Sequence, residues 1–98
     1  MHERTKKTAI PISVKMKVWE RDNRLCILCG RPGYPNAHCV NRSQAGLGIE
    51  TNIVTLCQEC HIEMDNGKNG TVKRKMVEAY LREHYPGWTK EAQVYSKW

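Results

Sequence analysis

Two Cys-x2-Cys pairs constrain this chain more than any other feature of its sequence. Cys26 and Cys29 form the first pair, Cys57 and Cys60 form the second, and 27 residues separate the pairs. Four thiolates at this spacing can close a tetrahedral zinc site, with one ligand pair in a tight turn and the other at the start of a helix. A chain of 98 residues buries a modest core, so bound metal adds directly to its folding free energy. The sequence therefore predicts a structural Zn²⁺.

The cysteines have two other interpretations. The run Cys57-Gln-Glu-Cys60-His61 also matches the pattern for c-type haem attachment, but that chemistry normally requires export and leaves the first cysteine pair unexplained. Four buried free cysteines are the other alternative, which two paired spacings disfavour. Cys39, the odd cysteine, is expected to be a small apolar residue in a strand and not a fifth ligand.

The length indicates one domain over residues 1–98. We expect residues 1–10 to be polar and mobile, residues 11–70 to form the zinc core, and residues 71–98 to form a C-terminal helix and tail. No apolar run approaches the ~20 residues of a membrane span, and the N-terminus has no signal-peptide pattern. These features predict no membrane association and a cytoplasmic location.

The charge is +6 and is unevenly distributed. Residues 1–24 carry seven Lys and Arg against three acidic residues, residues 25–70 carry three against four, and residues 71–98 carry six against three. A nearly neutral centre rich in Cys and His thus lies between two basic flanks. This balance favours nucleic acid as a partner, although a soluble protein that is merely basic remains the alternative.

Local patterns predict a mixture of helices and strands. Ser13 is expected to cap a short helix, and the apolar stripe of a later helix is expected to contain Val72, Met76, Val77, Tyr80 and Leu81. The tail is expected to pack through Trp88, Tyr95 and Trp98. The expected elements are a helix over 14–22, a loop over 30–37, strands over 37–42 and 52–56, and helices over 58–65 and 71–84.

Several polar residues lie within the segment that zinc would fold. His61 and Asp65 are four residues apart, so on a helix they share a face and can chelate a divalent cation. His38 lies on the facing strand, where a neutral imidazole can deprotonate water, and Arg42 nearby suits a phosphate. Together with Asn52 these residues are typical of metal-assisted phosphodiester hydrolysis. Each also has a plain structural interpretation, as a surface histidine, a turn residue or a solvated carboxylate.

Taken together, these motifs resemble those of the HNH endonuclease family, and more closely those of the small zinc-containing HNH proteins of bacteriophages. The resemblance spans roughly residues 18–66. It rests on the run Trp19-Glu20-Arg21-Asp22, on His38-Cys39-Val40-Asn41-Arg42-Ser43, on the loop Gly46-Leu47-Gly48-Ile49-Glu50, and on Asn52-Ile53-Val54-Thr55-Leu56-Cys57 with Cys60-His61.

The resemblance implies an α+β fold with a small zinc-stapled ββα-metal core, similar to a treble clef, and flanking helices at both ends. It implies that His38 is the general base, that Asn52 holds the loop and orients the base or binds metal, and that His61 is a ligand of a catalytic divalent cation, most simply Mg²⁺ or Mn²⁺. Asp65 matches a further ligand position. The implied activity is metal-dependent DNA cleavage, with nicking and double-strand cleavage both open.

The chain departs from the family pattern at Ala37, where members commonly carry Asp or His as a metal ligand. Three alternatives remain open: His61 and Asp65 suffice with waters and a phosphate, Asn52 or Asn36 fills the position, or the site is weak or inactive. A non-catalytic zinc-dependent nucleic-acid-binding module, or a subunit that depends on phage packaging proteins, would suit the last case.

DNA is the expected partner of the chain, which we expect to be a monomer in the host cytoplasm, since the sequence has no heptad pattern. Binding is expected to use phosphate contacts from the basic flanks. The candidate residues are Lys15, Lys17, Arg42, Lys73, Arg74 and Lys75.

Overall fold

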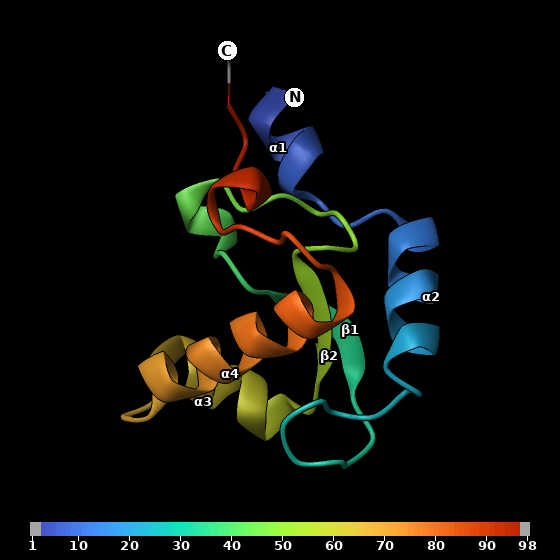
Figure 1. Ribbon diagram of the computed structural model, residues 1–98, viewed down its shortest axis with the longest axis vertical. Helices are drawn as coiled ribbons and strands as arrows, with labels where there is room; N and C mark the ends of the chain where they lie inside the picture. The colour runs from blue at the N-terminus through green and yellow to red at the C-terminus, as the bar shows by residue number, and fades with distance from the viewer. Residues whose placement is uncertain (1–2, 97–98) are drawn as a thin grey trace.

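The computed structural model describes residues 3–96, in which helices surround a two-stranded antiparallel sheet (Figure 1). This is the α+β class expected from the sequence. In chain order the elements are α1 (Glu3–Thr8), α2 (Ile12–Arg21), β1 (Tyr34–His38), the 3₁₀ turn η1 (Arg42–Gln44), β2 (Ile53–Leu56), α3 (Gln58–Asn66), α4 (Gly70–His84) and the 3₁₀ turn η2 (Glu91–Gln93).

β1 begins inside the segment 30–37, which the sequence predicted as a loop, and it ends at His38, whereas the predicted strand ran over 37–42. In the register of the two strands, Ala37 pairs with Val54 and His38 with Ile53, while a bulge separates these pairs from Tyr34. Pro35 lies within that irregular stretch. A proline fits there because a bulge on an edge strand does not require its missing N–H.

β2 is buried along its whole length, as expected for an apolar run between turn residues. α2 packs against both strands, and α3 packs against β2 and α4. In Figure 1, α4 crosses in front of the sheet and α2 stands beside it. The main core therefore lies between the sheet, the cysteine turns and the two helices α3 and α4, with Leu56, Met64, Val77 and Leu81 among its members.

Both predicted C-terminal helices are confirmed to within one residue at each end, but the apolar stripe of α4 is only partly correct. Val77 and Leu81 are fully buried, whereas Val72 is 59% exposed and Met76 is 49% exposed. The reason is the position of α4: its second half covers the sheet, and its first turns extend beside the end of α3 (Figure 1). Helix periodicity identifies a face but not how much of it a small core covers.

The N-terminal segment differs from the expectation of a mobile stretch over 1–10. Residues 3–8 form α1, and Thr8 is buried. The contacts that hold this segment are largely backbone ones: the Lys7 carbonyl accepts from Gly48 N at 3.0 Å, and the Thr8 carbonyl lies 2.9 Å from His38 Nε2. Such contacts leave no trace in side-chain patterning. Residues 1–2 lie outside the described residues.

The C-terminal tail packs as predicted where the structure describes it. Trp88 is buried and its Nε1 donates to the Thr51 carbonyl at 2.6 Å. Tyr95 donates its backbone N–H to the Ala45 carbonyl at 2.8 Å. Trp98 lies outside the described residues. Among residues 3–96, no helix combines the length and the apolar character that crossing a bilayer requires.

Candidate functional site

The two cysteine pairs meet in one cluster. The Sγ atoms of Cys26, Cys29, Cys57 and Cys60 all lie within 4.8 Å of one another, and those of Cys29 and Cys57 are 3.5 Å apart. Four sulfurs bound to one zinc at about 2.3 Å would lie roughly 3.8 Å from each other. The cluster therefore has the donor set and the spacing for a structural metal such as zinc.

Local backbone geometry brings each pair of thiols together. Gly30 N donates to the Cys26 carbonyl at 2.9 Å, and Gly30 has φ +79°, a conformation that favours glycine. Cys57 is the N-cap of α3, where its sulfur accepts the backbone N–H of Cys60 at 3.4 Å. One pair thus lies in a turn and the other at a helix start, as the spacing predicted.

The environment of the cluster favours a thiolate at Cys26. Burial raises the pKa of Cys26, but backbone N–H donors around it outweigh this effect and lower its pKa to about 7. The Lys73 ammonium lies 3.8 Å from Cys60 Sγ. A cation here offsets part of the negative charge of a four-thiolate site. Lys73 therefore faces the cysteine cluster, and not solvent as its predicted role in DNA binding requires.

Cys39 is separate from this cluster. It is fully buried and belongs to the apolar core. Burial raises the pKa of its thiol to about 12. It is a small apolar core residue, as predicted, but it follows the end of β1 and does not lie in a strand.

α3 carries the second candidate metal site. His61 Nε2 and Asp65 Oδ2 are 3.4 Å apart on successive turns, and both side chains are partly exposed. A hollow of about 440 Å³ adjoins Asp65 and is lined also by Arg42, Asn41, Ser43 and Asn66. An imidazole nitrogen and a carboxylate oxygen are thus available at an open surface with room for a phosphate. Among the described residues, however, only the four cysteines form a group of three or more potential metal-binding side chains.

His38 ends β1 and faces α1 with one of its ring nitrogens. Its Nε2 lies 2.9 Å from the Thr8 carbonyl oxygen. Burial lowers the pKa of His38, the Thr8 contact raises it, and electrostatic interactions with Arg42 and His61 lower it further. The net effect is a pKa below the ordinary value, so His38 is neutral near pH 7.

Asn52 is fully buried and holds the loop that follows His38. Its Oδ1 accepts from Val40 N at 2.9 Å, and its Nδ2 donates to the carbonyls of Leu47 at 2.8 Å and Val40 at 3.3 Å. Both ends of its amide are thus engaged by backbone. This geometry matches the loop-holding alternative for Asn52 and leaves its side chain away from solvent and cations.

Ala37, at the position where HNH proteins commonly carry a metal ligand, is fully buried in the core. Its neighbour Asn36 is exposed and lines a hollow together with Tyr34, Gln58 and His61. Position 37 therefore contributes no ligand. Of the two asparagines, Asn36 is exposed and shares a hollow with His61, whereas Asn52 is buried. Sequence alone left both asparagines open.

Arg74 has a different location from the one predicted. It was expected on the solvent face of its helix as a DNA contact, but only 19% of its side chain is exposed. Its guanidinium donates to the His38 and Cys39 carbonyls, to Asn41 Oδ1 at 3.1 Å and to Asp65 Oδ1 at 3.0 Å. Arg74 thus ties α4 to the residues around the candidate cation site, a position that helix periodicity did not reveal.

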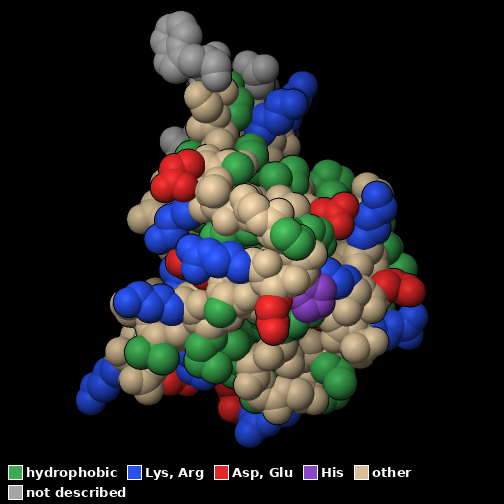
Figure 2. Space-filling view, in the orientation of Figure 1, with side chains coloured by type: hydrophobic (Ala, Val, Ile, Leu, Met, Phe, Trp, Pro, Cys, Tyr) green, Lys and Arg blue, Asp and Glu red, His purple; other side chains and the backbone are tan. Residues whose placement is uncertain are grey.

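The other predicted DNA contacts are distributed over separate elements. Lys15 and Lys17 are exposed on α2, and Lys75 is exposed on α4. Arg42 is exposed, and its Nε donates to Thr8 Oγ1 at 3.2 Å. On the face that carries α4, Figure 2 shows Lys and Arg side chains interspersed with Asp and Glu.

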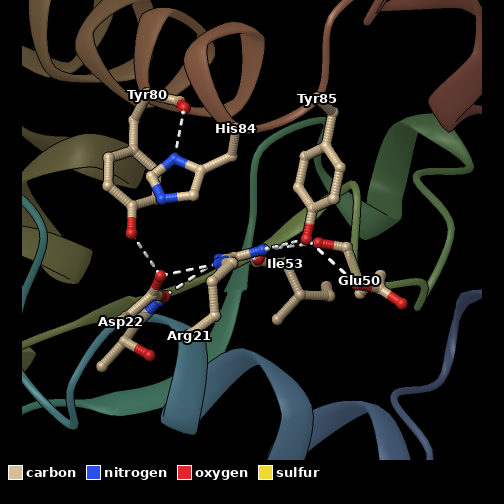
Figure 3. Close-up of polar contacts among 8 residues, drawn as sticks. Arg21, Asp22, Glu50, Ile53, Tyr80, His84 and Tyr85 are labelled. Atoms are coloured by element: carbon tan, nitrogen blue, oxygen red, sulfur yellow. Dashed lines mark hydrogen bonds and ion pairs between the residues drawn. The ribbon is translucent and has the colours of Figure 1, made fainter.

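A buried charge network joins α2 to α4 and was not foreseen from sequence. Arg21 pairs with Asp22 through two hydrogen bonds of 2.7 and 2.9 Å (Figure 3). Arg21 also donates to the Ile53 and Glu50 carbonyls at 2.9 Å each. Asp22 accepts from Tyr80 at 2.6 Å and from Thr55 N at 2.9 Å. The network holds β2 and the loop before it, and hence Asn52, against both helices.

Comparisons with protein families, curated proteins and solved structures find no match for this chain. The function is therefore argued from the residues and their geometry.

Proposed function

We propose that the protein is a metal-dependent DNA endonuclease of the HNH type. The observation that carries the proposal is the pairing of His61 with Asp65 at 3.4 Å on α3, beside a hollow large enough for a phosphate. Two further observations support the proposal. His38, whose pKa is lowered, ends β1, and Asn52 holds the loop that joins β1 to β2. The order β1, β2, α3 agrees with a ββα-metal core.

The donor set suits a hard divalent cation. A nitrogen and a carboxylate oxygen, completed by waters and phosphate oxygens, are compatible with Mg²⁺ or Mn²⁺, since Mg²⁺ retains several waters readily. When bound, the cation stabilises the negative charge of the departing oxygen. The second carboxylate oxygen of Asp65 accepts from Arg74, which orients the carboxylate so that its other oxygen lies beside His61.

His38 supplies the base. Its neutral imidazole removes a proton from water while the water oxygen forms a bond to phosphorus and the bond from phosphorus to the 3′ oxygen breaks. The products are a 5′ phosphate and a 3′ hydroxyl, the latter receiving a proton from solvent. Burial lowers the pKa of His38 below its ordinary value, which favours the unprotonated ring that this step requires.

DNA binding is assigned to exposed cations at the basic flanks. Lys15, Lys17 and Lys75 are exposed, and Arg42 lines the hollow beside Asp65. Such contacts follow the phosphate backbone and weaken with salt. Lys73 and Arg74 are not included among these DNA contacts, because Lys73 contacts the cysteine cluster and Arg74 pairs with Asp65.

The experiment is a supercoiled-plasmid assay with Mg²⁺ and Mn²⁺ that compares wild type with His38→Ala and Asp65→Ala. Relaxation or linearisation that requires the cation and disappears in His38→Ala supports the nuclease. Cleavage by His38→Ala at the wild-type rate refutes the base assignment. Glu83→Ala, at an exposed position of α4 that does not line this hollow, is the control and is expected to cleave normally.

A second candidate, a zinc-dependent nucleic-acid-binding module without catalysis, is favoured by one observation. Ala37 is buried, and among the described residues no third His, Cys, Asp or Glu joins His61 and Asp65. A folded, zinc-loaded wild type that binds DNA in a salt-dependent manner, but cleaves it under no divalent cation, would establish this alternative.

A further inference from the structure

We infer that α1 belongs to the active site: the backbone carbonyl of Thr8 holds the His38 imidazole and directs its other nitrogen to the substrate water. The inference rests on the proposed role of His38 as the base. It adds a positioning element from outside the segment 18–66 that resembles HNH proteins, in a region where the sequence indicated only a mobile stretch.

The direction of the hydrogen bond follows from its partners. A carbonyl oxygen accepts and never donates, so His38 Nε2 donates to Thr8 across the 2.9 Å contact. In a neutral imidazole the proton on Nε2 leaves Nδ1 as the basic nitrogen. The contact with α1 therefore selects Nδ1 as the atom that takes the proton from water.

The carbonyl of Thr8 is held in place on three sides. Thr8 is 3% exposed, and its hydroxyl accepts from Arg42 Nε at 3.2 Å. The preceding carbonyl, that of Lys7, accepts from Gly48 N at 3.0 Å. Gly48 also packs directly against Ala9, the residue after Thr8, since a Cβ added to Gly48 would be 2.0 Å from the Ala9 carbonyl oxygen.

This packing gives α1 a specific effect on the rate. An imidazole that can rotate spends less time with its basic nitrogen toward the water, so loss of one orienting hydrogen bond is expected to lower kcat about tenfold. DNA affinity does not depend on the orientation of one neutral ring, so KM is expected to stay within about twofold.

The most direct test weakens the carbonyl without changing any side chain. Residues 1–25 can be made by synthesis and joined at Cys26 to the remaining chain, with an ester in place of the amide between Thr8 and Ala9. An ester carbonyl is a weaker acceptor than an amide carbonyl. The first readout is the His38 Nε2 proton in NMR spectra, which a hydrogen bond protects from exchange with water, and the second is kcat and KM on plasmid DNA.

We expect a protected Nε2 proton in the all-amide protein, its loss or faster exchange in the ester, and a fall in kcat at unchanged KM. Gly48→Ala is expected to act in the same direction by displacing the segment around Ala9. The control is Lys6→Ala with Lys7→Ala, which removes exposed cations of α1 and keeps the carbonyl, and it should retain the protected proton.

Two results would overturn the inference: an Nε2 proton of His38 that exchanges as fast as a free imidazole in the all-amide protein, or an ester variant with wild-type kcat. A protected proton in a protein that cleaves no DNA would leave the contact standing and refute the proposed function, and with it the catalytic role of α1. The two failures are therefore distinguishable.

Discussion

The side chain of Asn52 pairs with both backbone groups of Val40, accepting from its N–H at 2.9 Å and donating to its carbonyl at 3.3 Å. One amide side chain thus replaces a neighbouring strand for the segment after β1. The loop between the strands leaves His38 at one end and returns to Asn52 at the other, so this pair determines where the loop closes.

Asn52→Ala is expected to lower the free energy of unfolding by about 3 kcal/mol, because buried backbone groups of Val40 and Leu47 lose their partner. Urea unfolding monitored by circular dichroism measures the change. The control is Asn36→Ala, since Asn36 is exposed and its loss should cost less than about 0.5 kcal/mol. Equal stability of the two variants would contradict the proposed contribution of the Asn52 hydrogen bonds to folding.

Removal of the structural metal is expected to unfold the core. Cys57→Ser, or chelation of the wild type, should abolish the cooperative thermal transition, because metal binding at four thiolates contributes directly to folding. Metal analysis should find one zinc per chain. Cys39→Ala, at a buried cysteine outside the cluster, should retain that zinc, and an equal loss of metal in this variant would contradict the assignment of the four ligands.

Arg74→Met and Lys75→Met should affect different properties although the residues are adjacent: the first should affect activation by Mn²⁺, and the second the salt dependence of DNA binding. Arg74 holds Asp65 and the backbone after His38, so its loss should weaken activation by Mn²⁺ and leave the salt dependence of DNA binding unchanged. Lys75 is exposed, so its loss should reduce the salt slope of DNA binding by about one. Titrations with Mn²⁺ and with salt measure the two effects. A lower salt slope for Arg74→Met would show that Arg74 contacts DNA phosphates and would contradict this prediction.

The rate of DNA cleavage should depend on the protonation of His38. Burial lowers the pKa of His38, so the neutral base is already dominant near pH 7, and kcat/KM should fall only as the pH drops through a midpoint below about 6.5. The positive charge of Arg42 contributes to this lowering, so Arg42→Gln should move the midpoint upward. A pH profile of both proteins checks the sign, and a midpoint above about 6.5 in the wild type would contradict it.

Asp22→Asn is expected to destabilise the protein by about 3–5 kcal/mol, because it leaves the buried Arg21 guanidinium without its counter-ion. Urea unfolding again gives the value. Glu20→Gln removes an exposed carboxylate two residues away and should have a small effect. A small effect of Asp22→Asn would show that the other partners of Arg21 hold the network alone.

The sequence by itself determined the features that depend on local spacing. Two Cys-x2-Cys turns predicted the four-sulfur cluster, and a buried apolar run and a helical period predicted β2, α3 and α4. His61 and Asp65 could be placed together because four residues on a helix return to the same face. In each case the relevant distance lies within a turn or two of chain.

Only the tertiary structure decided the features that depend on distant backbone. The position of α1 rests on contacts of the Lys7 and Thr8 carbonyls with residues 30 or more positions away. Arg74 turns inward because carbonyls and a carboxylate from other elements meet at its position. Backbone acceptors are identical at every residue, so no sequence pattern reveals which carbonyl a folded chain will bring to His38 or to Arg74.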